Sequence, residues 1–173
     1  MSAPLRIDLP EGDGDEVLRL FTMNPDMGMV AAAFSGKVYE KSKLAIRERE
    51  LVRMRIARIN DCSVCIATRT ADPATAGLTE DLYRDIEDWR TIEGLTDRER
   101  VAIEYAERYA LDHRNLDDDF WLRLRSLWSD DEVLDLTICI SAFLAMGRVI
   151  AVLGPTTECP IILDQPGPIL REA

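Results

Sequence analysis

Two cysteines three residues apart are the part of this sequence best suited to chemistry. Cys62 and Cys65 enclose a Ser-Val dipeptide and directly follow Asn60-Asp61. Asn and Asp are good helix N-caps, so we expect Cys62 in the first turn of a helix that runs to about Ala71. Residues three apart on a helix share a face, and the helix N-terminus lowers the pKa of a nearby thiol. The pattern predicts a dithiol–disulfide redox centre, in which one cysteine attacks and the other resolves.

The same two cysteines have two other interpretations. They can be small apolar residues packed in a core. They can also be half of a structural zinc site, which needs four ligands and would have to recruit Cys139 and Cys159. Those two cysteines are twenty residues apart and form no second CxxC motif. Cys139 also lies in a strongly apolar stretch, so we predict no metal site.

Glu50 is a candidate carboxylate partner of the dithiol, twelve residues before Cys62. On one straight helix this separation is about 18 Å, so the two residues would not meet. A chain that folds back at Asn60-Asp61 would bring the carboxylate toward the sulfurs, as a general base or as part of a proton relay. The residues alone favour a solvated glutamate, because Glu50 stands in an Arg/Glu-rich helix.

The spacing of these residues resembles a known family signature. Glu50, eleven residues, Cys62, two residues and Cys65 match the first part of E-x11-C-x2-C-x3-H, which is typical of the alkyl hydroperoxidase D-like part of the carboxymuconolactone decarboxylase family. The segments around the motif, at 47–51, 55–61 and 78–79, are similar as well. The clear resemblance covers about residues 44–89.

The resemblance implies a compact, all-α fold that assembles into homo-trimers or homo-hexamers. It also implies a thiol peroxidase or disulfide reductase, in which Cys65 is the peroxidatic nucleophile and Cys62 resolves its sulfenic acid. In that mechanism Glu50 starts the relay that deprotonates the thiol. The resemblance implies a dihydrolipoamide-bearing protein as the reductant, a small peroxide or disulfide as the substrate, and no bound cofactor.

The sequence departs from the family signature where the histidine should stand. That position is Arg69, and Val64 occupies a second place that is histidine in some relatives. On a continuous helix, Arg69 shares a face with Cys65 and would hold a thiolate by charge. It cannot shuttle a proton, because the pKa of arginine is above ~12. An exposed helix residue is the alternative interpretation, and His113 is too distant in sequence to take the role.

The pattern along the chain is helical throughout, without strand-like alternation. We predict one domain over residues 1–153, with about seven helices, and a Pro-rich arm over 154–173. Thr79 and Thr96 are expected helix caps, with a capping box at Thr96. The expected helices cover residues 15–23, 26–40, 44–59, 62–71, the segment from Thr79 to Gly94, 96–112, 117–127 and 130–153.

Composition limits the partners and the location. The 173 residues carry a net charge of −11, which disfavours nucleic acid and anionic membranes. The chain has one histidine, which excludes metal sites that need two or more histidine ligands. The polar start of the chain lacks a secretory apolar segment, so we expect a cytoplasmic protein. Residues 133–153 are almost continuously apolar but carry Asp135 and Arg148, which indicates a core or subunit-interface helix rather than a membrane span.

Three functions follow in order of preference. The first is a thiol–disulfide oxidoreductase or hydroperoxide reductase that uses Cys65, Cys62, Glu50 and Arg69. The second is a decarboxylase-branch enzyme that acts on a small lactone-type acid without cysteine chemistry. A pocket with two or more arginines and no accessible thiol would favour it. The third is a non-catalytic oligomeric scaffold or sensor, which unperturbed thiol pKa values would favour.

Overall fold

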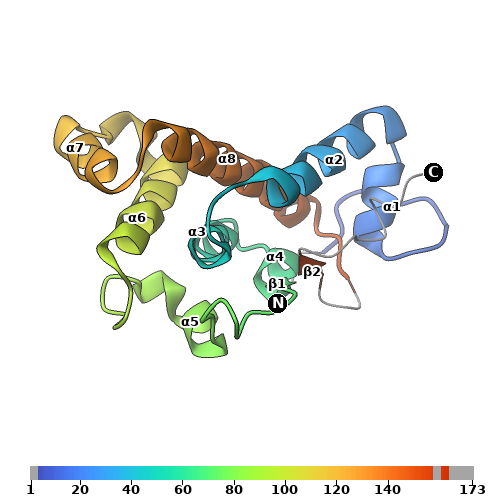
Figure 1. Ribbon diagram of the computed structural model, residues 1–173. Coiled ribbons are helices and arrows are strands. Elements are labelled where there is room, and N and C mark those ends of the chain that lie inside the picture. Colours follow the sequence, from blue (N-terminus) through green and yellow to red (C-terminus); the bar gives the residue numbers. More distant parts are fainter. Residues whose placement is uncertain (1–3, 158–160, 164–173) are drawn as a thin grey trace.

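The chain folds into α-helices joined by short turns, as a computed structural model that describes residues 4–157 and 161–163 shows (Figure 1). The all-α prediction is confirmed, with eight α-helices in the described residues where about seven were expected. They are α1 (Glu16–Thr22), α2 (Pro25–Lys41), α3 (Ile46–Ile59), α4 (Ser63–Ala67), α5 (Glu80–Asp85), α6 (Asp97–Asp112), α7 (Asp118–Leu127) and α8 (Asp130–Leu153). The smaller elements are two 3-10 helices, Ile86–Asp88 and His113–Asn115, and two strands, β1 (Arg69–Thr70) and β2 (Ile162–Leu163).

Side-chain caps set where several helices begin. The Thr96 hydroxyl accepts from the backbone N–H of Glu99, and the Glu99 carboxylate accepts from the backbone N–H of Thr96. Ser129 and Glu132 form the same reciprocal pair at the start of α8. These contacts satisfy N–H groups that have no partner inside the helix. The predicted caps at Thr79 and Thr96 are therefore confirmed.

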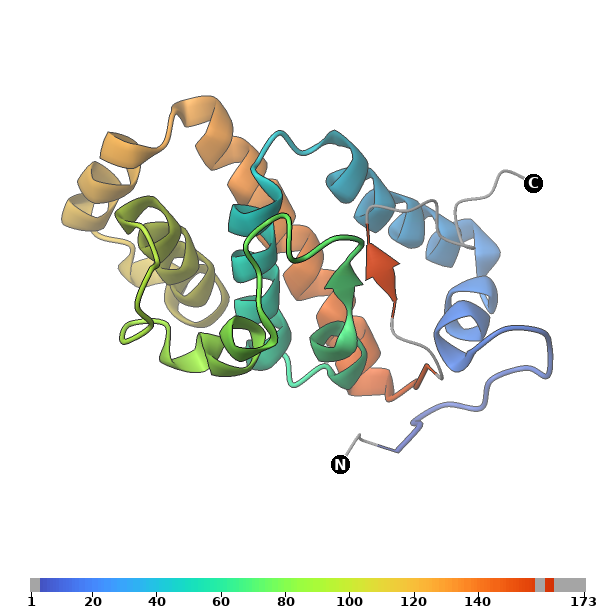
Figure 2. The ribbon, with the colours of Figure 1, turned by 60° about the horizontal axis from the view of Figure 1, so that its bottom comes forward.

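Helix α3 lies in the centre of the molecule, between α6 and α8 (Figures 1 and 2). Helix α8 runs along the molecule and contacts α2, α3, α4 and α6. The largest apolar cluster forms where these helices meet, with Val52 and Ile56 of α3, Phe120 of α7, and Leu136 and Ile140 of α8. Burial of these side chains away from water holds α3 in place, and α3 carries Glu50.

Helix α8 is long and apolar enough to cross a membrane by length and composition, the one such helix in the described part of the chain. In this structure it is a core helix, because Leu136, Cys139, Ile140 and Phe143 are buried against the rest of the fold. Some of its apolar side chains still face outward, Leu134 and Val152 among them. The sequence interpretation as a core or interface helix fits this packing.

The helix that carries the cysteines is shorter than predicted. It ends at Ala67 rather than near residue 71. The Thr68 hydroxyl donates to the carbonyl of Val64 at 2.9 Å, and the chain then becomes extended. Arg69 and Thr70 pair in parallel with Ile162 and Leu163, so a strand pairing from the far end of the chain replaces the last helical turn.

One other helix differs from the sequence prediction. The helix expected from Thr79 to Gly94 consists of α5 and a 3-10 helix that ends at Asp88. The sequence predicts the tail as an extended arm or wrap, and the contacts of its described residues are with the chain itself. Thr156 donates to the Glu16 carboxylate, and Ile162 belongs to β2. Residues 158–160 and 164–173, and with them Cys159, lie outside the described part.

Candidate active site

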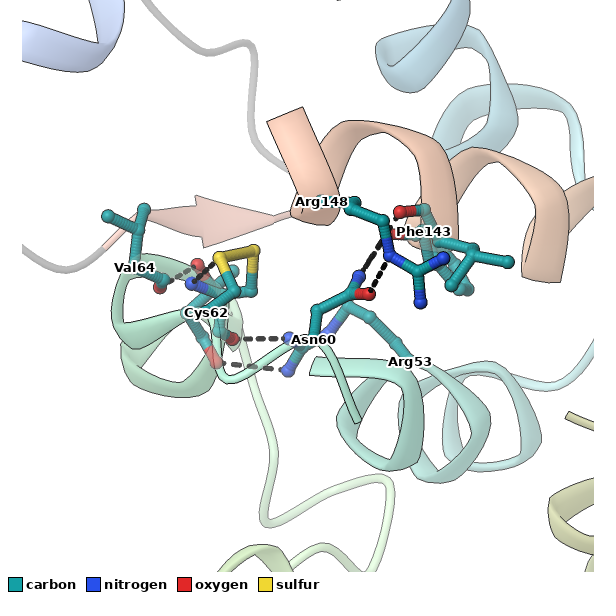
Figure 3. Close-up of a disulfide and its surroundings, with 9 residues drawn as sticks. Arg53, Asn60, Cys62, Val64, Phe143 and Arg148 are labelled. Carbon is teal, nitrogen blue, oxygen red and sulfur yellow. Dashed lines mark hydrogen bonds between the residues drawn. A yellow bond between two sulfur atoms is a disulfide. The ribbon is translucent and has the colours of Figure 1, made fainter. Parts of the chain in front are cut away.

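Cys62 and Cys65 form a disulfide at the start of α4 (Figure 3). Their Cα atoms are 5.2 Å apart, within the range that a disulfide spans without backbone rearrangement. Cys62 itself is the N-cap, and its Sγ accepts from the backbone N–H of Cys65 at 3.2 Å. The expected cap at Asn60-Asp61 is wrong by one residue, because Asp61 adopts a left-handed turn with φ of 50°.

The two sulfurs differ in their access to solvent. Cys62 is 0% exposed and lies in an apolar cluster with Val17, Phe21 and Ile150. Cys65 is only partly buried and touches two apolar clusters. Cys65 is therefore the less buried of the two cysteines.

Gly147 of α8 lets the helix approach the disulfide closely. A Cβ at Gly147 would lie 3.5 Å from the Sγ of Cys65 and 2.7 Å from the Nδ2 of Asn60. The second distance is shorter than real Cβ contacts allow, so a larger residue would force the Asn60 side chain or α8 to move. The glycine places Cys65 against the backbone of α8.

Asn60 joins the end of α3 to α8 beside the disulfide. Its Nδ2 donates to the carbonyls of Phe143 and Leu144 at 3.4 and 3.1 Å, and its Oδ1 accepts from the Nε of Arg148 at 3.2 Å. Figure 3 shows this group of residues next to the disulfide, in the space between α4 and α8. Asn60 thus holds the exposed Arg148 side chain against the end of α3.

Glu50 is buried, contrary to the solvated helix face that the residues alone favoured. Its exposed fraction is 0%, and both carboxylate oxygens have partners. Oε1 accepts from the Nε of Arg53 at 2.7 Å, and Oε2 accepts from the Nη2 of Arg53 at 2.9 Å and from the Tyr83 hydroxyl at 3.0 Å. Burial of a carboxylate in a core requires such a counterion and hydrogen bonds.

Arg53 connects this carboxylate to the cysteine segment. Besides Glu50, its guanidinium donates through Nη1 to the backbone carbonyl of Cys65 at 2.7 Å and through Nη2 to that of Thr68 at 3.0 Å. Those carbonyls lie in the last turn and at the C-cap of α4, where the helix leaves carbonyls unpaired. Glu50 and the cysteines are thus linked through Arg53, which holds the backbone around Cys65.

The charges in this network stabilise one another. Burial by itself would lower the pKa of Arg53, but the adjacent Glu50 carboxylate raises it overall. Burial and the same carboxylate raise the pKa of the Tyr83 hydroxyl above its ordinary value. Arg53 is therefore charged and Tyr83 neutral at physiological pH.

Arg69 lies outside α4, so the prediction that it shares a helical face with Cys65 is wrong. It belongs to β1, and its guanidinium donates to both carboxylate oxygens of Glu80 at 2.9 and 2.8 Å. It also donates to the carbonyl of Ile66 and lies over the ring of Tyr83. The hydrogen bonds to Glu80 raise the pKa of Arg69 further. Its charge is compensated by Glu80.

A pocket of about 650 Å3 borders α4. Its wall includes Ser63 and Ile66 of α4, Asn60 at the end of α3, and Arg148 of α8, with Arg69 at its side. This volume is within the usual range of small-molecule sites.

Comparison with known proteins now places the site in a family. Residues 25–108 match the model of the carboxymuconolactone decarboxylase family, a span that contains Glu50 and both cysteines. Residues 25–108 thus belong to the carboxymuconolactone decarboxylase family. YdfG of Bacillus subtilis, an uncharacterized protein, is 24% identical over 119 residues, which are 68% of this chain and 81% of YdfG.

Two further matches show how far the similarity to known proteins extends. The uncharacterized protein Rv2313c of Mycobacterium tuberculosis is 34% identical over 113 residues, 64% of this chain but only 40% of that protein. The structure of an alkylhydroperoxidase AhpD core from Ralstonia eutropha, an uncharacterized peroxidase-related protein, matches with a TM-score of 0.71 and 16% identity over 91% of this chain and 94% of that one. The AhpD-like fold predicted from the sequence is therefore confirmed.

The decarboxylase alternative predicts a pocket with two or more arginines and no accessible thiol. The structure meets only part of this criterion. Two arginines, Arg69 and Arg148, line the pocket, but Cys65 beside it is partly accessible. Within residues 4–157 and 161–163, no group of three His, Cys, Asp or Glu side chains is arranged to hold a metal ion. Cys139 is a buried free thiol inside α8, and His113 is exposed at the end of α6.

Sequence reasoning missed four residues of this site. Arg53 carried a signal, because it stands three residues after Glu50 on the same helical face. Arg148 was noticed only as an interruption of an apolar stretch. Asn60 was interpreted as a cap for the next helix, although its side chain bonds α8. Nothing in the sequence around Tyr83 indicates its contact with Glu50.

Proposed function

We propose that this chain is a thiol–disulfide oxidoreductase that reduces hydroperoxides through Cys62 and Cys65. The observation that carries the proposal is the disulfide between these two residues at the start of α4, with one sulfur partly accessible. A dithiol that closes without backbone rearrangement suits repeated oxidation and reduction. The peroxidase-related name of the Ralstonia eutropha protein, a fold relative, supports the same reaction class.

Cys65 is the proposed nucleophile and Cys62 the proposed resolving residue, because Cys65 is only partly buried whereas Cys62 is fully buried. The Cys65 thiolate attacks an oxygen of ROOH, the O–O bond breaks, and the alkoxide takes a proton to leave as ROH. Cys65 is then a sulfenic acid. The Cys62 thiol attacks its sulfur, so that the S–S bond forms and water leaves. The sum is ROOH plus two thiols to ROH, water and a disulfide.

A dithiol reductant completes the cycle. One of its thiolates attacks the sulfur of the less buried Cys65 and forms a mixed disulfide, which releases Cys62 as a thiolate. The second thiol of the reductant then displaces Cys65 and closes its own disulfide. We propose a dihydrolipoamide-bearing protein as this partner, in accord with the family resemblance.

We assign Glu50 a positioning role within this mechanism. Both of its oxygens are occupied by Arg53 and Tyr83, so the carboxylate acts on the site through the Arg53 contact to the Cys65 carbonyl. Arg69 is assigned to the wall of the pocket, because Glu80 already compensates its charge.

Self-association belongs to the same proposal. Helix α2 exposes Met27, Val30 and Phe34, the apolar positions that the sequence showed at helical spacing, while Val38 on the same stripe is buried. A contiguous exposed apolar stripe is typical of an interaction surface. We propose that α2 takes part in a homo-oligomer, a trimer or hexamer, of a soluble cytoplasmic protein.

The experiment is a stopped-flow assay with tert-butyl hydroperoxide and excess dihydrolipoamide. Cys65→Ser is expected to abolish turnover. Cys62→Ser that has been reduced and then freed of the dithiol is expected to consume one equivalent of peroxide and leave a sulfenic acid that dimedone traps. Cys139→Ser is the matched control and should turn over like wild type. Peroxide consumption by Cys65→Ser at the wild-type rate would contradict the proposal.

A further inference from the structure

The pocket beside the disulfide has an apolar wall. Ile59, Ile66, Ala67, Ala151 and Val152 contribute to it, from the end of α3, from α4 and from the last turns of α8. A wall of this kind favours an apolar ligand body over a small hydrated molecule, because burial of apolar surface drives binding. A bare peroxide such as H2O2 would make no use of it.

Arg148 gives the same pocket a positive charge that is not compensated by an ion pair. Its Nε donates to the Oδ1 of Asn60, which fixes the side chain, and Arg148 forms no ion pair with any described residue. Arg69 in the same wall differs, because Glu80 pairs with it. The Nη1 and Nη2 groups of Arg148 remain as donors, in the fork geometry that suits a carboxylate.

Asp61 opposes this charge from the same wall. Its carboxylate lines the pocket but forms no ion pair with Arg148 in the described structure. A bound anion would be attracted by Arg148 and repelled by Asp61, so the two residues predict effects of opposite sign.

The pocket borders the helix that carries the disulfide, although neither Cys62 nor Cys65 is among the residues that line it. Arg148 directly follows Gly147, at which a Cβ would lie 3.5 Å from the Sγ of Cys65. Ser63 and Ile66, on either side of Val64 and Cys65 in α4, also line the pocket. A ligand in this pocket therefore lies against α4 and α8. Figure 3 shows Arg148 of α8 bonded to Asn60 beside the disulfide.

We propose that this pocket binds an organic carboxylate with an apolar body, its carboxylate on Arg148 and its body along the apolar wall. This inference rests on the proposed function, for which it names the substrate class: a hydroperoxide of an apolar carboxylic acid. Reduction by the two thiols gives the corresponding hydroxy acid and water, as in the reaction balanced above.

Binding of the unreactive probe decanoate tests the site without redox chemistry. Titration by calorimetry is expected to show binding at least about tenfold weaker for Arg148→Gln than for wild type, the size expected for a lost charged hydrogen bond. Arg148→Lys should retain part of the affinity, and Asp61→Asn should bind several times more tightly. The neutral probe decanol should bind Arg148→Gln and wild type alike. Arg114→Gln, at an exposed arginine elsewhere, is the matched control.

The redox assay separates the two proposals. With Arg148→Gln, kcat/KM for a carboxylated hydroperoxide should fall about tenfold relative to neutral cumene hydroperoxide. Equal decanoate affinity in wild type and Arg148→Gln, with cumene hydroperoxide still reduced, would overturn this inference and leave the proposed function. Decanoate binding that depends on Arg148, with neither hydroperoxide reduced, would overturn the proposed function and the substrate class together. If Arg148→Gln does not fold, the test uses Arg148→Lys and Asp61→Asn. The inference then requires weaker decanoate binding by Arg148→Lys and tighter binding by Asp61→Asn.

Discussion

The guanidinium of Arg53 donates a 2.7 Å hydrogen bond to the backbone carbonyl of Cys65. The same group binds both oxygens of the buried Glu50 carboxylate. One cation of α3 therefore supports the backbone of the cysteine helix and neutralises a charge in the core. The position of Cys65 depends on this ion pair, although neither of its members contacts a sulfur through a hydrogen bond in the described structure.

Replacement of Arg53 by methionine should strongly destabilise the fold. The Glu50 carboxylate would remain buried without its counterion, and the carbonyls of Cys65 and Thr68 would lose their donor. We expect the free energy of unfolding to fall by about 3–5 kcal/mol, measured by denaturation in guanidinium chloride. The double variant Glu50→Gln/Arg53→Met should recover part of the loss. Equal losses in the single and double variants would argue against the ion pair as the cause.

Glu50→Gln separates a positioning carboxylate from a general base. Glutamine keeps the shape and one acceptor oxygen for Arg53, so a positioning role predicts peroxide reduction within about tenfold of wild type at each pH. A proton-transfer role predicts a loss of about 10²–10⁴-fold. The measurement is the pH profile of kcat/KM together with the alkylation rate of the reduced Cys65. A loss in the larger range, with an unchanged fold, would restore the role of base to Glu50.

Gly147→Ala should disturb the contact between α8 and the cysteine helix. The new Cβ would lie 2.7 Å from the Nδ2 of Asn60, so Asn60 or α8 must move. We expect a loss of about 1–3 kcal/mol in the free energy of unfolding, typical of overpacking, despite the better helix propensity of alanine. Gly12→Ala is the control, because nothing lies within 4 Å of a Cβ there. Similar stability of both variants would contradict the close approach.

Cys139 should react with alkylating agents only when the protein unfolds. Burial raises the pKa of this thiol from 9.0 to about 12, so the folded protein keeps it protonated at pH 9 to 10. The unfolded chain releases this proton near pH 9, so the contribution of Cys139 to stability falls as the pH rises from about 9 toward 12. Iodoacetamide labelling at pH 9, with and without urea, measures the difference. Fast labelling of the folded Cys62→Ser/Cys65→Ser variant would contradict a buried, protonated thiol.

Val30→Glu should dissociate the proposed oligomer. Val30 lies on the exposed apolar stripe of α2 with Met27 and Phe34, and a buried unpaired carboxylate at an interface is costly. Light scattering coupled to size exclusion should show the monomer mass of 19.6 kDa for the variant and a multiple of it for wild type. Leu122→Glu on the exposed face of α7 is the control. A wild-type protein that elutes as a monomer would refute the assembly.

The parts of this structure that depend on neighbouring residues could be predicted from the sequence. The capping boxes at Thr96 and Ser129 need residues only three positions apart, and the Cys62–Cys65 pair needs one helical turn. The burial of Glu50 could not be predicted, since an Arg/Glu-rich segment has the same composition on a solvated helix. Its burial depends on Tyr83, thirty-three residues later.

The prediction that Arg69 shares a helical face with Cys65 was wrong for a related reason. The residues after Cys65 allow another helical turn, but Arg69 and Thr70 pair with Ile162 and Leu163, more than ninety residues away. Local propensity cannot reveal a partner at that distance. The pocket arginine Arg148 was visible as a charge in an apolar stretch, but its orientation depends on Asn60 at the end of another helix.

The pairing of β1 with β2 has a practical consequence for anyone who shortens this chain. A truncation after Gly154, chosen because the Pro-rich end resembles a dispensable appendage, would delete the strand that fixes the segment two residues after α4. The backbone that leaves the disulfide would lose its hydrogen-bonded neighbour, and with it the restraint on Arg69 at the pocket wall. Ile162 and Leu163 are in this sense components of the candidate active site.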